Sequence, residues 1–221
     1  MTAFQNSFRI LSLSLAIIMG LVLQCGAANA QTRASIIVAG GCFWCVESDF
    51  EGVMGVTEAI SGFSGGSVEN PTYKQVTRGG TGHLEAVEIT YNPNRVDLNG
   101  LLYMFFRSID PTDAGGQFCD RGDSYRTAIW VGNPEERQIT ETAKAAAEAD
   151  LGQRIVTPIL DRVAFYAADD WHQDYYKGRR RVITRYGVIR QSDAYNRYRE
   201  ACGRDARVSE LWGDAAPFIH H

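Results

Sequence analysis

The chain has 221 residues, a formal net charge of -4 at pH 7, 45% hydrophobic residues and 22% charged residues. This composition is that of an ordinary globular protein, and the length suffices for one compact domain with a full core. The mild acidity gives no reason to expect nucleic acid as a partner, and no apolar run after residue 31 is long enough to span a membrane.

The first thirty residues form a separate region. Arg9 is their only charged residue, an apolar stretch follows from Ile10 to Leu23, and Ala28-Asn29-Ala30 has the small-x-small pattern of a cleavage site. We predict a secretory signal peptide, cleaved after Ala30, and a periplasmic or secreted mature protein without stable membrane association. The alternatives are an uncleaved membrane anchor and lipidation at Cys25, for which the preceding glutamine is a poor match.

Cleavage would leave four cysteines: Cys42, Cys45, Cys119 and Cys202. An even number of cysteines in an exported protein invites a disulfide interpretation, although a chain of this size does not need disulfides for stability. We therefore expect these cysteines to function chemically. Zinc is the alternative, but no second CxxC or pair of histidines accompanies Cys42 and Cys45, so we expect no metal site.

The most informative stretch surrounds Cys42. Residues 35–39 predict a buried strand, Gly40 and Gly41 a tight turn, and the residues from Phe43 to Glu51 a helix. A thiolate at a helix start is stabilised by free backbone N–H groups and the helix dipole. We therefore predict that Cys42 is a nucleophile whose pKa lies below the usual value of about 8.5. A buried structural cysteine is the alternative.

The next strands point to a second chemical group. Residues 55–63 predict a strand, Asn70 and Pro71 predict the start of a short helix or a turn, and residues 83–91 predict another strand. In this last strand Glu85 shares a face with apolar residues at 87, 89 and 91. Burial would raise the pKa of Glu85, so that it could act as a general acid. The alternatives are a reversed register or a solvated strand end.

The remaining chain alternates helices and strands without repeats or a linker. We therefore predict one α+β domain. We expect a basic run at 179–181 to be a solvated face and a polar, partly helical tail from Ser192 to Trp212. The other expected elements are helices at 98–109 and 134–151, a long loop at 112–124, a strand at 125–131, a strand within 155–166 that Pro158 interrupts, and a short helix after 169–170.

From about Ile36 to Tyr176 the chain resembles the A-type peptide methionine sulfoxide reductases. Gly41-Cys42-Phe43-Trp44 matches the signature of that family. Further segments that match the family pattern are Asn70-Pro71-Thr72-Tyr73, Thr81-Gly82-His83-Leu84-Glu85, Asp110-Pro111-Thr112, Asp120-Arg121-Gly122-Asp123-Ser124-Tyr125-Arg126 and His172-Gln173-Asp174-Tyr175.

The resemblance implies a central mixed β-sheet surrounded by helices, with a ferredoxin-like core. It implies reduction of the S-epimer of methionine sulfoxide, free or in proteins. The site residues that it implies are Cys42 as the nucleophile, Glu85 as the proton donor, Tyr73 and Tyr125 as hydrogen-bond donors to the sulfoxide oxygen, Phe43 and Trp44 around the methyl group, and Asp120 in the same pocket.

The chemistry of a sulfoxide fits this set of residues. The oxygen is a poor leaving group until it is protonated, so a nucleophile and an acid must act together. Cys42 would then remain as a sulfenic acid, which a second thiol condenses into a disulfide. An external, thioredoxin-like dithiol would restore the enzyme. We expect no cofactor, no metal and a monomeric protein.

The resemblance does not identify the resolving thiol. Many family members have glycine at the position of Cys45 and asparagine at the position of Cys119, and the familiar glycine-rich cysteine tail is absent. We predict that Cys202 resolves the sulfenic acid from a mobile C-terminal tail of a catalytic domain spanning residues 31–221. Cys119 and then Cys45 are the alternatives.

Two rival functions follow from the same residues. Cys42-Phe43-Trp44-Cys45 in an exported protein is also typical of a thiol–disulfide oxidoreductase. A module that binds oxidised methionine without turnover is the other rival. Disulfide exchange needs no clamp for an oxygen atom, so Glu85 and the tyrosines favour the reductase.

Overall fold

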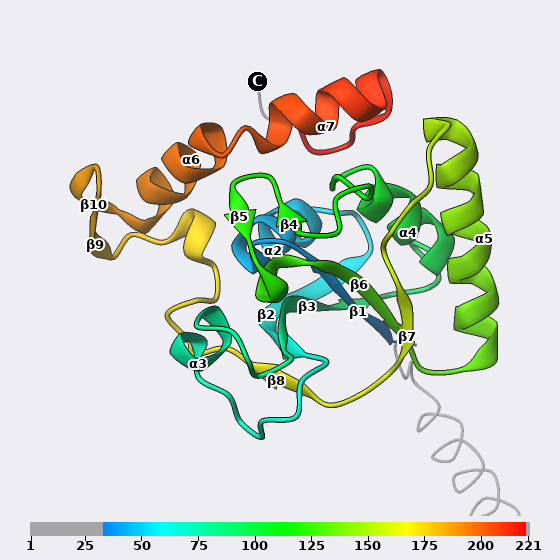
Figure 1. Ribbon diagram of the computed structural model, residues 1–221, viewed down its shortest axis with the longest axis horizontal. Helices are drawn as coiled ribbons and strands as arrows, with labels where there is room; N and C mark the ends of the chain where they lie inside the picture. The colour runs from blue at the N-terminus through cyan, green and yellow to red at the C-terminus, as the bar shows by residue number, and fades with distance from the viewer. Residues whose placement is uncertain (1–32, 220–221) are drawn as a thin grey trace, which may run out of the picture. The chain divides into compact units, whose positions relative to one another are not determined.

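The computed structural model describes residues 33–219, so the predicted signal peptide lies outside the described residues. Within residues 33–219, every helix is too short or too polar to cross a bilayer. The described chain is built around one sheet, with helices packed against it and two short hairpins beside it (Figure 1).

The central sheet has six strands and is mixed, as predicted. Each neighbouring pair is antiparallel except β6 and β7, which are parallel. The strands, in spatial order, are β7 (Ile159–Asp161), β6 (Thr127–Val131), β1 (Ala34–Gly40), β3 (Leu84–Tyr91), β2 (Val56–Ser64) and β8 (Phe165–Ala167).

The main core lies on one face of this sheet. Phe50 of α2 (Phe43–Glu51) and Leu101 of α4 (Leu98–Phe106) share this cluster with Ala147 of α5 (Pro134–Leu151). Val38 of β1 and Val87 of β3 are opposite each other in register and belong to the same cluster. Asp97 and Asn133 cap α4 and α5 by accepting backbone N–H groups, as their sequence positions lead one to expect.

The opposite face of the sheet carries a smaller cluster. Leu84 and Ala86 of β3 belong to it together with Trp130 of β6, whereas Val87 and Ile89 belong to the main core. The alternation of β3 is therefore the predicted one, and Glu85 shares the face of the larger cluster. This register aims the Glu85 side chain towards the start of α2.

Several short elements differ from the sequence predictions. The helix expected at Pro71 begins two residues later as α3 (Tyr73–Thr77), with Thr72 as its cap. Asn70 has a left-handed φ of 47°, whereas an N-cap residue is extended, and Thr72 satisfies that requirement. The long loop contains β4 (Gly116–Gln117), β5 (Asp120–Arg121) and a 3-10 turn, Asp123–Tyr125, so Tyr125 precedes the strand.

After β8 the chain continues through turns into a 3-10 helix, Tyr175–Lys177, which begins later than the short helix expected directly after 169–170. Arg181 starts a hairpin of β9 (Arg181–Thr184) and β10 (Gly187–Arg190). The sequence predicted only a solvated basic run at 179–181 here and no hairpin. The polar tail then forms α6 (Gln191–Ala201), α7 (Arg204–Trp212) and a final 3-10 turn, Gly213–Ala215.

The two C-terminal helices pack on the domain through buried residues. Tyr195 of α6 and Val208 and Trp212 of α7 are each at most 8% exposed. Cys202 lies at the junction of the two helices, as the residue that ends α6. This packing brings Cys202 back to the region where α2 begins; the mobility of the tail stays a prediction.

Candidate active site

The turn before α2 fixes the position of Cys42. Gly41 has a φ of +84°, and a Cβ atom there would lie 2.6 Å from the Cβ of Gln117, so the turn requires glycine. Cys42 is the residue that starts α2, and its carbonyl accepts hydrogen bonds from the N–H groups of Cys45 at 3.0 Å and Val46 at 3.4 Å. The thiol therefore lies at a helix start, as the sequence indicated.

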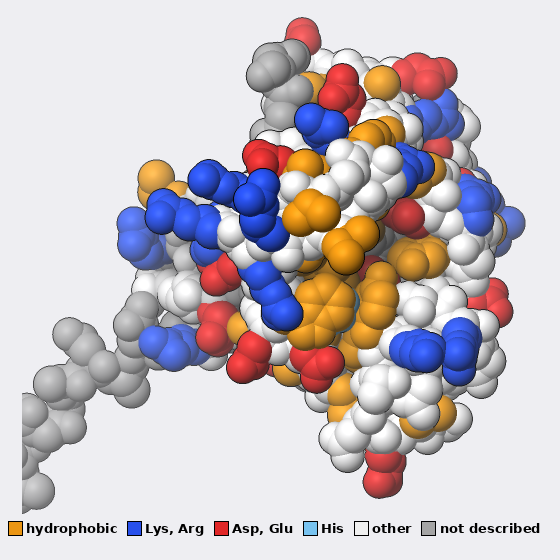
Figure 2. Space-filling model, turned by 90° about the vertical axis from the view of Figure 1, so that its left-hand side faces the viewer, with side chains coloured by type: hydrophobic (Ala, Val, Ile, Leu, Met, Phe, Trp, Pro, Cys, Tyr) orange, Lys and Arg blue, Asp and Glu red, His pale blue; other side chains and the backbone are white. Residues whose placement is uncertain are grey.

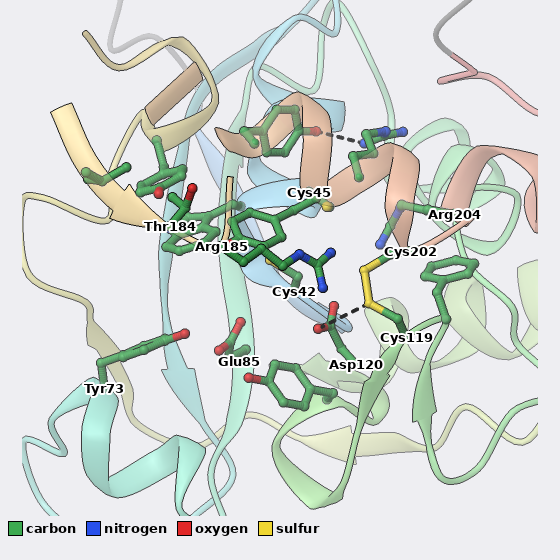
Figure 3. Close-up of a pocket in the computed structure, with 18 of the residues that line it drawn as sticks. Cys42, Cys45, Tyr73, Glu85, Cys119, Asp120, Thr184, Arg185, Cys202 and Arg204 are labelled. Carbon is green, nitrogen blue, oxygen red and sulfur yellow. Dashed lines mark hydrogen bonds between the residues drawn. A yellow bond between two sulfur atoms is a disulfide. The ribbon is translucent and has the colours of Figure 1, made fainter. Parts of the chain in front are cut away.

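A cavity of about 800 Å³ opens over this turn. The predicted site residues come together on its wall from distant parts of the sequence, with Phe43 as the exception (Figure 3). The residues of that set which line the cavity are Cys42, Trp44, Tyr73, Glu85, Asp120 and Tyr125, and the candidate resolving thiols Cys45, Cys119 and Cys202 line it as well.

Glu85 is 1% exposed and is fixed through one of its two oxygens. The backbone N–H of Phe43 donates to Oε2 at 3.0 Å, which ties the carboxyl group to the residue after Cys42. Oε1 has no hydrogen-bond partner within residues 33–219. Burial raises the pKa of Glu85 from an ordinary 4.5 to about 8, so the group carries a proton at neutral pH, as predicted.

Two tyrosine hydroxyls complete the polar part of the wall. Tyr73 is the first residue of α3, and Tyr125 ends the 3-10 turn before β6. Burial raises the pKa of both hydroxyls, so both remain protonated. Burial also raises the pKa of Asp120 on the same wall. The two tyrosine hydroxyls and the protonated Glu85 carboxyl are therefore neutral O–H donors in the site.

An aromatic wall faces these polar groups. Trp44 stacks on Tyr175 with ring centroids 3.8 Å apart and an angle of 9° between the planes. Phe43 is 1% exposed and lies behind the wall, where its ring packs against Tyr73 and His172 at 6.0 and 5.2 Å. A direct contact of Phe43 with a substrate methyl group stays a prediction.

Tyr175 lines the cavity together with Trp171, although neither residue had a predicted role in the site. The His172-Gln173-Asp174-Tyr175 segment had been noted only as a match to the family. Its position next to a signature residue could not be read from the sequence, because the two segments are more than 120 residues apart.

The ionisation of Cys42 differs from the prediction. Contact with the Cys45 thiol, and then burial, raise the pKa of Cys42, and the nearby Glu85 and Asp120 act in the same direction. The prediction of a lowered pKa for Cys42 was therefore wrong, because these effects outweigh the helix start. The hydrogen bond with Cys42, assisted by Arg204 and Arg199, instead lowers the pKa of Cys45.

Cys119 and Cys202 form a disulfide on the same wall as Cys42, although they are 83 residues apart in the sequence. Cys42 and Cys45 are free thiols. Cys119 is exposed, whereas Cys45 is buried against Tyr175 and Tyr195. The structure therefore joins the two cysteines that the sequence analysis ranked first and second as resolving thiols.

A buried arginine holds this disulfide near the nucleophile. Arg204, two residues after Cys202, is 2% exposed and donates to the carbonyls of Gly40 at 3.2 Å and Ser108 at 2.9 Å. Its guanidinium lies 4.8 Å from the ring centre of Phe118, the neighbour of Cys119. The same side chain thus contacts the turn before Cys42 and both segments of the disulfide. Nothing in the sequence pattern had marked it.

Two groups of side chains in the described chain have donors close enough to hold a metal ion. In the first, both Cys119 and Cys202 use their sulfurs in the disulfide. In the second, Glu47 accepts the N–H of Asp174 at 2.5 Å, and Glu51 accepts Lys177 at 2.8 Å. These sulfur and carboxylate atoms already have partners in the protein, so neither cluster offers a full set of free ligand atoms for a metal ion.

The raised pKa of Glu85 has a consequence for stability that can be measured. A carboxyl whose pKa is higher in the folded state than in the unfolded state stabilises the fold at low pH. That contribution is lost as the pH rises from about 4.5 through about 8. We expect Glu85→Gln, which cannot ionise, to gain stability relative to the wild type as the pH rises from 5 to 9. Urea unfolding at both pH values measures this; a difference that does not change with pH would contradict it.

The comparisons with known proteins agree with this geometry. A profile of the family described as peptide methionine sulfoxide reductase matches residues 34–204. The chain is 44% identical over 188 residues to peptide methionine sulfoxide reductase MsrA 2 of Caulobacter vibrioides, covering 85% of this chain and 89% of that protein. It is 46% identical over 189 residues to the protein of the same name from Rhizobium meliloti, covering 86% and 88%.

A solved structure of methionine sulfoxide reductase A from Corynebacterium diphtheriae superimposes with a TM-score of 0.60. It is 32% identical to this chain, and the superposition covers 68% of this chain and 76% of that one. The sequence matches span most of both proteins, and they include the Cys42 turn and the Glu85 strand within the profile match. The chain therefore belongs to the peptide methionine sulfoxide reductase family, a family of oxidoreductases.

Proposed function

We propose that this protein reduces the S-epimer of methionine sulfoxide, free and in proteins, with Cys42 as the nucleophile and Glu85 as the acid. Family membership makes the protein a methionine sulfoxide reductase. The epimer and the residue roles are the proposal. The observation that carries it is a free thiol at a helix start in one cavity with a buried, protonated carboxyl whose Oε1 has no partner in residues 33–219.

The proposed reductase step balances without a cofactor. Tyr73 and Tyr125 donate to the sulfoxide oxygen, and Glu85 transfers its proton to that oxygen. The sulfur of Cys42 attacks the sulfoxide sulfur, and the proton of the thiol returns to the Glu85 carboxylate. The attack forms a transient bond between the two sulfurs. The protonated oxygen then leaves the methionine sulfur and bonds, as a hydroxyl group, to the Cys42 sulfur, while the bond between the sulfurs breaks. Methionine leaves, and Cys42 becomes a sulfenic acid. One sulfoxide is thereby reduced by two electrons, and one thiol is oxidised by two.

The side chains around the cavity suit this assignment. An aromatic surface such as that of Trp44 and Tyr175 favours an apolar methyl group. Two hydroxyls and a neutral carboxyl favour an oxygen that gains negative charge as the sulfur is attacked. Asp120, on the same wall, is the remaining group that we place in the substrate pocket.

The recovery step uses the remaining thiols. We propose that Cys202, as a reduced thiol, attacks the sulfenic acid of Cys42 and forms a disulfide with release of water. Cys119 then attacks the Cys202 sulfur, which frees Cys42 and leaves the Cys119–Cys202 disulfide found in the structure. An external thioredoxin-like dithiol reduces that disulfide at the exposed Cys119. Cys45 is the third candidate for the first attack.

Incubation of the mature protein with dithiothreitol and each epimer of N-acetylmethionine sulfoxide tests the proposed function. We expect N-acetylmethionine from the S-epimer and none from the R-epimer. Binding without turnover would instead identify a binding module. Reduction of an insulin disulfide with no loss of sulfoxide would identify the thiol–disulfide oxidoreductase.

The assignment of the resolving thiol predicts different products for two serine variants. With a thioredoxin-like reductant, Cys202→Ser is expected to complete one turnover and stop as a sulfenic acid, which dimedone traps on Cys42. Cys119→Ser is expected to accumulate the Cys42–Cys202 disulfide, which peptide mass mapping detects. If Cys202→Ser recycles normally and Cys119→Ser retains the sulfenic acid, Cys119 is the resolving thiol.

We also propose that the core is ferredoxin-like. The order β6-β1-β3-β2 within the sheet supports this, because these four antiparallel strands follow a β-α-β-β-α-β path with α2 and α4 as the two helices. Strands β7 and β8 extend this core at its two edges.

Export is a further part of the proposal. Its support is the apolar stretch before Ala28-Asn29-Ala30, which precedes the described residues. The mature protein is expected to begin at Gln31. Amino-terminal sequencing of protein from a periplasmic fraction measures this, and an intact Met1 there would contradict cleavage.

A further inference from the structure

The segment between residues 175 and 192 carries a concentrated positive charge. It contains six basic residues and no acidic residue, although the whole chain has a net charge of -4. Lys177 forms ion pairs with Glu51 and Asp174. The other five are exposed and form no ion pair within residues 33–219; they are Arg179, Arg180, Arg181, Arg185 and Arg190.

The charged segment adjoins the active-site cavity. Figure 2 shows Lys and Arg side chains gathered beside an apolar hollow on the side of the molecule where β9 and β10 lie. The lining of the cavity includes six consecutive residues, 180–185. Side chains alternate between the two faces of a strand, so an unbroken run means that β9 presents its edge to the cavity.

The edge of β9 that faces away from β10 has free backbone groups. The N–H of Gln191 donates to the carbonyl of Arg180 at 2.9 Å, so this pair is hydrogen-bonded across the hairpin. Hydrogen-bonded and non-hydrogen-bonded pairs alternate along an antiparallel hairpin. Residues 182 and 184 therefore face β10, and the backbone groups of Arg181 and Ile183 face the open edge.

The side chains of β9 alternate between a face that packs on the domain and a face that is exposed to solvent. Val182 and Ile189 pack against the buried cluster of Tyr175 and Tyr195. On the other face Ile183 is 89% exposed and lies opposite Val188, which is 55% exposed. Arg181 lies directly opposite Arg190, an arrangement of like charges that destabilises a hairpin. An exposed apolar pair and a like-charge pair beside the cavity fit a surface that binds a partner.

We propose that the open edge of β9 binds an extended segment of the oxidised protein substrate, and that acidic residues near the methionine sulfoxide contact Arg180 and Arg181. The proposal rests on the proposed function. The segment would add a strand to β9, while its methionine sulfoxide enters the cavity towards Cys42. The free backbone groups at the edge of β9 can hydrogen-bond to any extended peptide. The arginines without ion pairs favour peptides that carry acidic residues. The enzyme would thus favour oxidised methionine in acidic, unfolded segments.

Peptide substrates of opposite charge test the arginines. The probes are three seven-residue peptides with a central methionine S-sulfoxide flanked by Glu, Lys or Ser, with dithiothreitol as reductant. We expect kcat/KM for the Glu peptide to exceed that for the Lys peptide by about tenfold at low salt, and the difference to shrink as salt is added.

A pair of double variants assigns this preference to β9. In Arg180→Gln/Arg181→Gln we expect the preference to fall to about twofold. The control is Arg95→Gln/Arg154→Gln, which removes the same charge from two exposed arginines that do not line the cavity. The control is expected to keep the wild-type preference.

Two proline variants test the backbone edge. Proline at 183 removes an N–H from the open edge, and proline at 188 removes the equivalent N–H from the outer edge of β10, which does not line the cavity. The readout is the ratio of kcat/KM for the Ser peptide to that for N-acetylmethionine S-sulfoxide. We expect Ile183→Pro to lower the ratio about tenfold and Val188→Pro to change it less than about twofold.

The outcomes separate this inference from the function on which it rests. If the wild type reduces neither the peptides nor N-acetylmethionine sulfoxide, the proposed function fails. The wild type is expected instead to reduce both the peptides and N-acetylmethionine sulfoxide. In that case, an equal preference for the Glu peptide in both double variants, or equal kcat/KM ratios in the two proline variants, would show that β9 is not the substrate-binding surface. If the arginine variants slow turnover only with a protein dithiol as reductant, the hairpin binds the reductant, and the inference is overturned.

Discussion

Cys42→Ser is expected to abolish the reduction of methionine sulfoxide. The serine hydroxyl keeps the shape of the turn, but it is a far weaker nucleophile and cannot form a sulfenic acid. Activity should fall to the detection limit even with dithiothreitol as reductant, which can reduce Cys42 directly without the other cysteines. Formation of N-acetylmethionine from N-acetylmethionine S-sulfoxide measures this loss.

The matched control for Cys42→Ser is Cys45→Ser. This thiol lies one helical turn away in the same cavity and interacts with Cys42. We expect Cys45→Ser to complete a single turnover, since it keeps the attacking thiol. Removing Cys45 also removes the contact that contributes most to the raised pKa of Cys42, so the single-turnover rate near neutral pH should rise. Substantial turnover by Cys42→Ser would overturn the assignment of the nucleophile.

Glu85→Gln is expected to slow the reductase step by roughly 10²- to 10⁴-fold. The amide keeps the hydrogen bond from Phe43 but has no acidic proton to transfer to the sulfoxide oxygen. The loss should be smaller at low pH, where solvent supplies acid. Glu88→Gln is the matched control, because Glu88 lies three residues along the same strand and pairs with Arg162 away from the cavity. Rapid-quench measurement of the first turnover gives both rates.

The pH dependence of that first turnover follows from the raised pKa. Glu85 is protonated below about 8 and loses its proton above it. The rate in the wild type should therefore fall as the pH rises beyond about 8, even though the fraction of Cys42 thiolate increases. Glu85→Gln should not show this fall. A wild-type rate that keeps rising through pH 9 would rule out a rate-limiting proton transfer from Glu85.

The parts of the site that the sequence predicted depend on local patterns. Two glycines between a strand and a helix placed Cys42, because a side chain at Gly41 would collide with Gln117. Period-two alternation placed Glu85 on the face of β3 that carries Val87 and Ile89, and the structure confirms that this face packs in the larger cluster and that Glu85 is buried. Both inferences used only residues within a few positions of the group concerned.

The parts that the sequence could not predict depend on contacts between distant segments. The pairing of Cys119 with Cys202 joins a loop to the end of α6, and Arg204 links that junction to the turn at Gly40. No periodicity specifies such contacts. The pKa of Cys42 was predicted in the wrong direction because the helix start is visible in the sequence, whereas burial and the Cys45 contact are not.

The most direct test of the proposed chemistry uses a chain that begins at Gln31 and holds Cys42 as its only thiol. Cys45, Cys119 and Cys202 are replaced by serine, and the protein is mixed with excess methionine S-sulfoxide and dimedone. We expect one methionine released per protein and one dimedone adduct, on the peptide that contains Cys42. Absence of released methionine, or release without an adduct on Cys42, would contradict the proposed chemistry.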